Sequence, residues 1–361
     1  MTRVLHIVGK MDRGGAETMI MNMFRHIDKD IKFDFLVFSN VAGDYDAEII
    51  NLGGKIIPIV SINPVIRSFL LFKFLRDHPE YQIVHSHTLL SSGFHLWMAA
   101  IAGVKGRIAH SHSTNYKTGF INSFYRRLTT FLINRYCTHA IACGKLASNF
   151  LFPARLDVKL LPNAVDTRRL GELESRKDYI VNLFGANELK IIQVGRLENV
   201  KNHIFTINFA SYLKDRNVNF VIYFVGKGGL IDDLKSVVDR RDLADKIKFL
   251  GLRDDIPQLM ASADFMIMPS LHEGFPLVLV ESQSVGLKTL ASDRVSKEVD
   301  LGFNLMRFIS LDEDFSRWEY ELLNWQKEKI VDKENRLNKL DELGFNVVKN
   351  IKEMTNFYKS V

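Results

Sequence analysis

The sequence predicts an α/β protein with two domains, each built from strands and helices that alternate around a parallel sheet. Its 361 residues are enough for two domains of ordinary size, with a core in each. Short apolar runs alternate with helical patterns along most of the chain, which favours parallel sheets. Polar clusters follow the predicted strands, where ligands bind in such sheets. We expect a first domain over residues 1–165, a second over 166–345 and a terminal helical segment over 346–361.

Composition favours a folded protein in a reducing compartment. Hydrophobic residues make up 47% of the chain, and low-complexity segments are absent. Residues 2–9 are typical of a short strand and lack the long apolar region of a signal peptide, and no run is long enough to span a membrane. Cys137 and Cys143 have neither metal-binding nor redox spacing. We therefore expect a cytoplasmic protein.

The net charge of +6 is unevenly distributed along the chain. Residues 81–156 contain no Asp or Glu but several Lys and Arg, which predicts a positive face on the first domain. No nucleic-acid-binding motif accompanies this charge, so nucleic acid is not an expected partner. An anionic membrane surface or a diphosphate-bearing substrate accounts for the positive charge better. We therefore expect the protein to be able to associate peripherally with the inner face of a membrane.

The first predicted strand, residues 3–8, leads through a Gly-rich turn into a helix that runs to about residue 24. Gly14 and Gly15 precede this helix, and a helix N-terminus after a Gly-rich turn can bind an anion. The pattern is neither a dinucleotide fingerprint nor a Walker loop, so an ordinary turn remains an alternative. Further strands are expected over 33–38, 55–60, 82–85, 104–110, 139–143 and 158–161.

Two of these strands end in His-Ser-His, at His85–His87 and at His110–His112. In a strand, His110 and His112 share one face. Such a pair can bind metal, but no third ligand follows at zinc spacing, so no metal is expected. Hydrogen-bonded structural histidines are the alternative to a binding role.

A helix predicted over residues 121–136 carries an apolar stripe of Phe124, Leu128, Phe131 and Leu132, with arginines off the stripe. Two interpretations remain open for this helix. It packs on its own domain, as most such helices do, or it docks on anionic lipid.

The second domain is predicted to begin with a strand over residues 189–194. The following loop carries Arg196 and Lys201 and leads into a helix over 203–213. A planar guanidinium and a mobile ammonium near a helix N-terminus suit a diphosphate, although a Lys–Arg pair on a loop is also common on ordinary surfaces. Strands over 219–225 and 246–250 follow. The loop after the second of these offers the backbone groups of Leu252 and Arg253 to a nucleotide base.

A strand over residues 264–269 leads to the most informative loop in the chain. The loop carries Glu273 and Gly274 and passes through Phe275 and Pro276 into a helix over 277–285. The backbone amides of Gly274, Phe275 and Leu277 lie at the positive end of this helix, and Glu281 lies one to two turns further along. Two carboxylates that accept from hydroxyls, with amides that donate, indicate a site for a polyhydroxylated, anionic ligand.

Glu273 and Glu281, separated by seven residues in the stretch HEGFPLVLVE, resemble the signature of the retaining glycosyltransferases of family 4. Pro162–Asp166 also resembles a family motif, Pro-Asn-Gly-Val-Asp, with Ala164 in place of Gly. The resemblance implies the GT-B fold, in which two Rossmann-like domains face each other across a cleft and the C-terminal helix returns to the first domain.

The resemblance also implies an activity, namely transfer of a sugar from a nucleotide-diphosphate sugar, with UDP-sugar as the expected donor. The implied acceptor is a saccharide, expected to be lipid-linked, in capsule or exopolysaccharide assembly. No cofactor and no metal are implied, because fixed cations neutralise the leaving diphosphate. The acceptor hydroxyl attacks from the side of the leaving group, and a phosphate oxygen takes its proton.

Residue roles follow by the same resemblance. Arg196 and Lys201 bind the diphosphate, with the Gly14–Gly15 loop against it. Glu281 accepts from the ribose hydroxyls, while Glu273 and residues 274–277 hold the sugar, with Gly274, Phe275 and Leu277 as amide donors. His112, favoured over His110 because it is nearer the loop, orients the sugar and the acceptor. The residues expected to act in catalysis are His112, Glu273, Arg196 and Lys201.

Two other functions remain open at this point. A nucleotide-sugar 2-epimerase of the same fold would need further acid–base carboxylates, and a non-catalytic nucleotide-sugar-binding subunit would keep the pocket without activity. The sequence does not identify the sugar, the linkage position or the oligomeric state.

Overall fold

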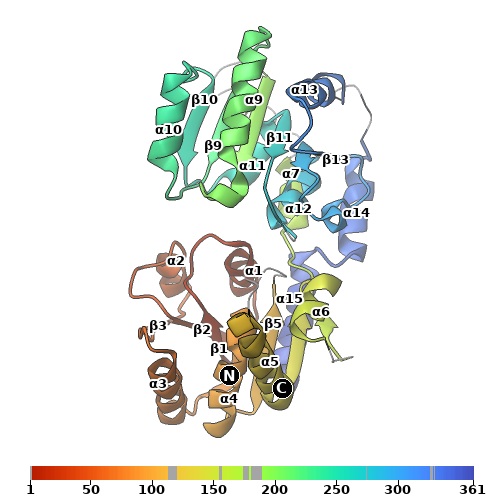
Figure 1. The fold of residues 1–361 in the computed structure, drawn as a ribbon. Helices are drawn as coiled ribbons and strands as arrows, with labels where there is room; N and C mark the ends of the chain where they lie inside the picture. Colours follow the sequence, from red (N-terminus) through yellow and green to blue (C-terminus); the bar gives the residue numbers. More distant parts are fainter. Residues whose placement is uncertain are drawn as a thin grey trace. The chain divides into compact units, whose positions relative to one another are not determined.

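A computed structural model describes residues 2–112, 120–153, 157–173, 179, 189–273, 275–325, 328 and 330–361. The chain forms two compact units (Figure 1). Unit 1 comprises Met1–Val165 and Gly344–Val361, and unit 2 comprises Asp166–Leu343. The return to unit 1 begins two residues before the expected boundary at 346, because Gly344 ends the preceding helix with a φ of +82° and the carbonyl of Phe345 accepts from Val165 N at 3.0 Å.

Unit 1 contains a seven-stranded sheet in the order β3-β2-β1-β4-β5-β6-β7, in which the paired strands are parallel. The expected strands are all present, with ends shifted by a few residues. Their bounds are β1 (Thr2–Val8), β2 (Ile31–Val37), β3 (Ile56–Pro58), β4 (Tyr81–Ser86), β5 (Gly106–Ser111), β6 (His139–Ala142) and β7 (Lys159–Leu160).

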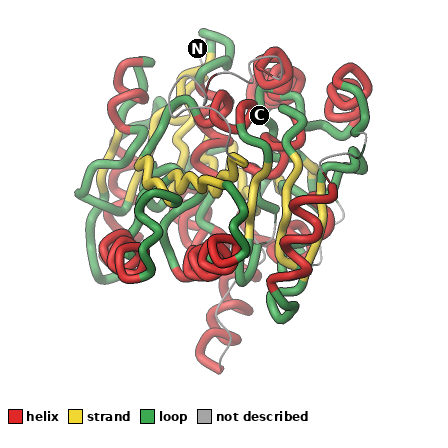
Figure 2. The backbone as a smooth tube through the Cα atoms, turned by 90° about the horizontal axis from the view of Figure 1, so that it is seen from above, coloured by secondary structure: helices red, strands yellow, loops and turns green. Residues whose placement is uncertain are grey.

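Figure 2 shows that the strands of the molecule are surrounded by helices. One face of the seven-stranded sheet buries Leu5, Ile7, Val84 and Ala109 in the main hydrophobic core of unit 1. Residues that alternate with these, among them His6, lie on the other face because side chains alternate along a strand. The helices are α1 (Gly15–Phe24), α2 (Asp46–Asn51), α3 (Pro64–Asp77), η1 (Leu89–Ser91), α4 (Ser92–Ile101), α5 (Phe120–Tyr136), α6 (Lys145–Leu151) and α15 (Val347–Ser360).

The C-terminal helix α15 belongs to unit 1, as the resemblance implies. The Tyr358 hydroxyl lies 2.7 Å from His85 Nδ1 in the second face of the sheet. Asn350 donates to the carbonyl of Pro162 at 3.1 Å, and Lys359 pairs with Asp28 at 2.8 Å. The helix is therefore part of the unit that contains the first strands of the chain.

The apolar stripe expected on α5 points to solvent. Phe124 and Phe131 are 69% and 63% exposed, and Leu128 is exposed as well. The helix instead buries a neighbouring stripe that contains Thr129 and Ile133, because α4 packs against this side. Only Leu132 of the predicted stripe is buried, so the helix packs on its own unit through other residues than expected.

Unit 2 contains a six-stranded sheet in the order β10-β9-β8-β11-β12-β13, again with parallel pairs. In each sheet the first strand lies between the second and the fourth, so the strand order reverses beside it. In unit 2 this reversal lies between β8 and β11. The strands are β8 (Leu189–Val194), β9 (Phe220–Val225), β10 (Ile247–Gly251), β11 (Phe265–Met268), β12 (Lys288–Ser292) and β13 (Met306–Ile309).

The helices of unit 2 begin with α7 (Thr167–Leu173), directly after the boundary with unit 1. It is a packed element, since Thr167, Leu170 and Leu173 are buried and Gly171 lies against Leu337. The helices are α7 (Thr167–Leu173), η2 (Asn199–Lys201), α9 (His203–Asp215), α10 (Ile231–Arg240), α11 (Ile256–Ser262), α12 (Leu277–Ser284), η3 (Lys297–Val299), α13 (Phe315–Asn324) and α14 (Lys333–Glu342). Among the described residues, no helix is both long and apolar enough to cross a membrane.

Candidate functional site

In unit 2, the loops after β8 and β11 meet at the reversal of strand order, where ligands bind in open α/β sheets. Backbone and side-chain bonds join the two loops. Leu271 N donates to the carbonyl of Val200 at 2.8 Å, and Asn202 Nδ2 donates to the carbonyl of Pro269 at 3.0 Å. Gln193 Nε2 in turn donates to the carbonyl of Lys201 at 2.9 Å. The loops are therefore held together before any ligand binds.

These bonds place Lys201 beside Glu273. Lys201 Nζ lies 2.6 Å from Glu273 Oε1, and each side chain is only 17% exposed. The sequence assigns these two residues to different parts of a ligand, and the structure brings them into one ion pair. In the free protein the two charges neutralise each other, so an anionic ligand must share Lys201 with Glu273.

Two glycines allow this close arrangement. A Cβ on Gly195 would lie 3.1 Å from Lys201 Cε, so the lysine stem runs across the bare backbone of Gly195. A Cβ on Gly226 would lie 2.1 Å from the carbonyl oxygen of Gly195, which no side chain can tolerate. The loops after β8 and β9 therefore depend on glycine at these contacts.

Arg196 lies next to Gly195 and is more open than Lys201. Its side chain is 60% exposed, and Nη1 lies 2.9 Å from Glu198 Oε1. An exposed pair of this kind adds little to stability, about 0–1 kcal/mol, so the guanidinium can exchange Glu198 for a ligand at small cost.

Glu281 is the fifth residue of α12 and is half-buried. Burial raises the pKa of Glu281 to about 7. The expected amide donors precede this helix. Pro276 caps α12, Leu277 is buried and Phe275 is half-buried. The predicted role of Gly274 lies outside the described residues. Hydroxyl donors that stabilise the Glu281 carboxylate would lower its pKa again.

The loop after β10 carries Leu252 and Arg253, whose backbone groups are expected to contact a nucleotide base. Leu252 is 40% exposed, whereas the Arg253 guanidinium makes a bidentate pair with Asp255 at 2.7 and 2.6 Å. Tyr179 also donates to Asp255, at 2.7 Å. The Arg253 side chain is therefore committed within unit 2, and its predicted contribution remains one of backbone groups.

In unit 1, Gly14 is the N-cap residue of α1, and Gly15 is the first residue of the helix. A Cβ on Gly14 would lie 2.3 Å from Glu17 Oε2, so the Glu17 side chain folds back over Gly14. No atom lies within 4 Å of the Cβ position of Gly15. In the free protein the Glu17 side chain therefore lies at the N-terminus of α1, where the sequence predicts that an anion binds.

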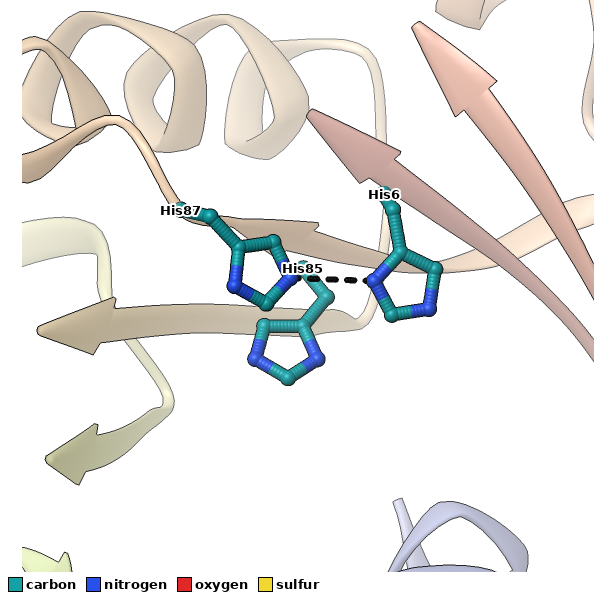
Figure 3. Close-up of side chains that lie close together, drawn as sticks. All are labelled: His6, His85 and His87. Atoms are coloured by element: carbon teal, nitrogen blue, oxygen red, sulfur yellow. Dashed lines mark hydrogen bonds between the residues drawn. The ribbon is translucent and has the colours of Figure 1, made fainter. Parts of the chain in front are cut away.

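Histidines form a hydrogen-bonded chain across the ends of β1, β4 and β5. His6 Nδ1 lies 3.0 Å from His87 Nε2, and His87 Nδ1 lies 2.8 Å from His112 Nε2. His112 Nδ1 lies 3.3 Å from Asn163 Oδ1. Figure 3 shows His6 and His87 joined in this way, with His85 beside them. If Asn163 Oδ1 accepts, each histidine donates from Nδ1, and both nitrogens of His112 are occupied.

His110 differs from its neighbours. It is fully buried, and neither ring nitrogen has a hydrogen-bond partner among the described residues. Burial, followed by the neighbouring histidines, lowers the pKa of His110 well below its usual value, so the ring is neutral. Sequence reasoning finds no third histidine at zinc spacing along the chain, but His87 on the adjacent strand lies close to His110 and His112.

The sequence singles out the strand end that contains His87 and the motif that contains Asn163, but it does not join them to His112, and it misses His6. A signal was present, because two neighbouring strands end in His-Ser-His and His6 lies in register with His85. Strand order is needed to use this signal, and the sequence does not supply it.

Comparison with known proteins follows the same division of the chain. A sequence model described as Glycosyltransferase Family 4 matches residues 13–169, and one described as Glycosyl transferases group 1 matches residues 176–300. EpsF of Bacillus subtilis, whose name describes it as a glycosyltransferase, is 36% identical and covers 99% of this chain and 96% of its own length. The capsular polysaccharide biosynthesis glycosyltransferase CapH of Staphylococcus aureus is 25% identical and covers 100% of this chain and 99% of its own.

Solved structures give the fold. Alr3699/HepE of Anabaena in complex with UDP-glucose aligns with a TM-score of 0.79 at 20% identity, over the whole of both chains. WaaG, a glycosyltransferase of lipopolysaccharide biosynthesis, aligns with a TM-score of 0.64 at 15% identity over 98% of this chain and 95% of its own. The two parallel sheets and these structural relatives identify the fold as GT-B.

Proposed function

This chain belongs to the family 4 glycosyltransferases, and we propose that it transfers a sugar from a UDP-sugar to a lipid-linked saccharide, with retention, in surface polysaccharide assembly. The observation that carries the proposal is the Lys201–Glu273 pair at the reversal of strand order in unit 2. A cation and a sugar-binding carboxylate side by side suit a sugar attached to a diphosphate.

The relatives support the choice of donor and acceptor. HepE is solved with UDP and with UDP-glucose. A relative from Escherichia coli, 26% identical over 80% of this chain, is named as a galactosyltransferase that uses UDP-Gal and a diphosphoundecaprenol-linked sugar. A relative from Campylobacter jejuni is also named for a diphospho-undecaprenol acceptor. A UDP-sugar and a polyprenyl-diphosphate saccharide are thus the substrates to test first.

In the proposed mechanism, unit 2 binds the donor. Lys201 and Arg196 contact the diphosphate and stabilise the negative charge that develops on it as the glycosidic bond breaks. Glu281 accepts from the ribose hydroxyls. Glu273 accepts from hydroxyls of the sugar, with backbone amides at the start of α12 as donors. The backbone at Leu252 and Arg253 contacts the base. In unit 1, the Gly14–Gly15 end of α1 becomes able to accept an anion once the Glu17 side chain moves aside.

The acceptor hydroxyl is proposed to attack from the side that the diphosphate leaves, so that the anomeric configuration is retained. A diphosphate oxygen takes the hydroxyl proton, and neither an enzyme base nor a metal ion takes part. His112 is proposed to orient the sugar and the acceptor. Because both of its nitrogens are engaged in the free protein, it must exchange either His87 or Asn163 for a substrate hydroxyl.

A membrane-facing surface on unit 1 would suit a lipid-linked acceptor. Phe69 on α3 is 61% exposed, and Phe124 and Phe131 on α5 are also exposed, with basic residues on both helices. Both helices pack against α4, so they belong to the same layer. Exposed aromatic rings beside Lys and Arg suit an anionic lipid surface. We therefore propose peripheral association with the inner face of the membrane.

Co-sedimentation with vesicles that contain phosphatidylglycerol, at low salt, tests this association. A variant with Phe69→Ser, Phe124→Ser and Phe131→Ser should lose most of its binding, because each buried Phe contributes about 1.5–3 kcal/mol. Leu323→Ser, which changes an exposed apolar residue of unit 2, is the control and should bind like the wild type. If the wild type does not sediment with the vesicles, the membrane proposal is wrong.

The transfer proposal is tested by release of nucleotide diphosphate from UDP-, GDP- and ADP-sugars, with and without a polyprenyl-diphosphate saccharide. Acceptor-dependent release of UDP, lost in Lys201→Met, is the expected result. A changed sugar without acceptor would indicate an epimerase instead. Binding of UDP-sugar without turnover under any condition would indicate a binding subunit.

A further inference from the structure

Five histidines form one layer on the face of the unit 1 sheet that α15 covers, namely His6, His85, His87, His110 and His112. They come from β1, β4 and β5 and from the residue that follows each of the last two strands. Neighbouring ring centroids lie between 3.9 and 5.3 Å apart. The proposed transfer reaction uses His112 of this layer and leaves the other four without a role.

We propose that His87, His110 and His112 bind one divalent transition-metal ion. One ring nitrogen from each lies within 4.8 Å of the others. His110 and His112 stand two residues apart on one face of the chain, and His87 comes from the adjacent strand. Three neutral imidazoles suit Zn²⁺, Co²⁺, Ni²⁺ or Cu²⁺, whereas Mg²⁺ and Ca²⁺ prefer oxygen ligands.

The unpartnered nitrogens of His110 are the second observation that points to a ligand. A buried polar atom without a hydrogen-bond partner destabilises the folded state, and both nitrogens of His110 lack a partner among the described residues. Coordination of an ion by either nitrogen would remove part of this destabilisation. Of the three proposed ligands, His87 and His112 already have hydrogen-bond partners, so His110 is the one whose nitrogens lack them among the described residues.

The surrounding hydrogen bonds fit metal ligation. A histidine that binds a metal usually donates its other N–H to a fixed acceptor, which orients the ring. His112 Nδ1 already donates to Asn163 Oδ1, which leaves Nε2 as the ligand atom. His87 Nδ1 becomes a ligand atom when its proton moves to Nε2, where His6 Nδ1 can accept it at 3.0 Å. His6 then carries its own proton on Nε2, so no proton leaves the cluster.

The environment limits what this ion does. His112 is half-buried at the strand end, so water can fill the remaining coordination position of the ion. The Lys201–Glu273 pair belongs to unit 2, and the transfer mechanism does not use the ion. Because the metal occupies the ring nitrogen of His112 that His87 now contacts, we expect it to stabilise the folded unit 1. The metal proposal does not rest on the proposed transfer reaction.

Titration of the chelator-treated protein, prepared without a polyhistidine tag, with Co²⁺ tests the proposal. The visible absorption of Co²⁺ reports the ligand geometry, and thermal unfolding reports the stabilisation of the folded state. We expect one Co²⁺ per chain, with d–d bands of a four- or five-coordinate site and a rise in Tm.

His110→Phe keeps a ring of similar shape but removes both nitrogens, and it should lose the absorption bands and the rise in Tm. His26→Gln changes an exposed histidine elsewhere in unit 1 and should bind Co²⁺ like the wild type. If His110→Phe does not fold, His112→Gln at the strand end serves in its place. The proposal would be overturned if the folded wild type shows no Co²⁺ absorption bands, or if these bands are unchanged in a folded His110→Phe or His112→Gln variant.

Discussion

Replacement of Glu273 by Gln should strengthen UDP binding while it weakens sugar transfer. In the free protein Glu273 Oε1 lies 2.6 Å from Lys201 Nζ and neutralises it, with both side chains largely shielded from solvent. A diphosphate that shares this ammonium also meets the negative charge of Glu273. Removal of that charge frees Lys201 and removes the repulsion, which we put at about 1–2 kcal/mol at an effective dielectric constant between those of water and a protein surface.

The expected gain in UDP affinity is therefore about 5- to 30-fold, measured by isothermal titration calorimetry at low ionic strength. The kcat/KM for transfer should fall by about 10- to 150-fold, because a hydrogen bond to a charged group contributes about 1.5–3 kcal/mol. Asp239→Asn, which makes the same charge change on an exposed face of α10, is the control. Unchanged or weaker UDP binding in Glu273→Gln, or an equal gain in Asp239→Asn, would refute the reasoning.

Three further predictions concern the same unit. Arg196→Ala should weaken UDP binding by about 10- to 150-fold, and Arg196→Lys should recover only part of the loss, because a lysine cannot make the planar double contact of a guanidinium with phosphate oxygens. Full activity in Arg196→Ala would remove this residue from the site. UDP affinity should rise about tenfold between about pH 6 and pH 8, because burial raises the pKa of Glu281 to about 7 in the free protein and ribose hydroxyls lower this pKa in the complex, so binding releases a proton. Glu281→Gln should flatten this pH profile, and a wild-type affinity that falls over the same pH range would contradict the prediction. Gly226→Ala should destabilise unit 2 by about 3 kcal/mol in urea unfolding, because the new Cβ would meet the Gly195 carbonyl oxygen at 2.1 Å and the φ of Gly226 is +143°. Gly229→Ala is the control, because no atom lies within 4 Å of its Cβ position, and equal stabilities of the two variants would show that the loop adapts.

The strands could be predicted from sequence because parallel strands are buried on both faces and read as short apolar runs. The strand β13 (Met306–Ile309) escaped this reasoning, since Arg307 interrupts its apolar run. The two interpretations of the apolar stripe on α5 stayed open for a different reason. Helical spacing of Phe124, Leu128 and Phe131 shows that these side chains share a face, but not whether that face is covered.

Residue types at the candidate site could be predicted, but their contacts could not. Lys201 and Glu273 are far apart in the sequence and meet because β8 and β11 are neighbours in the sheet. The histidine chain likewise joins His6, His87, His112 and Asn163 from separate parts of the chain. Spacing along the chain detects ligands within one loop or strand, whereas these clusters depend on strand order.

A crystal structure of the protein with UDP bound would test the central claim most directly. We predict that Lys201 Nζ lies within hydrogen-bond distance of a diphosphate oxygen, that the Glu281 carboxylate accepts from the ribose hydroxyls, and that Glu273 no longer holds Lys201 alone. UDP bound away from the loops after β8 and β11, with the Lys201–Glu273 pair unchanged, would contradict the account.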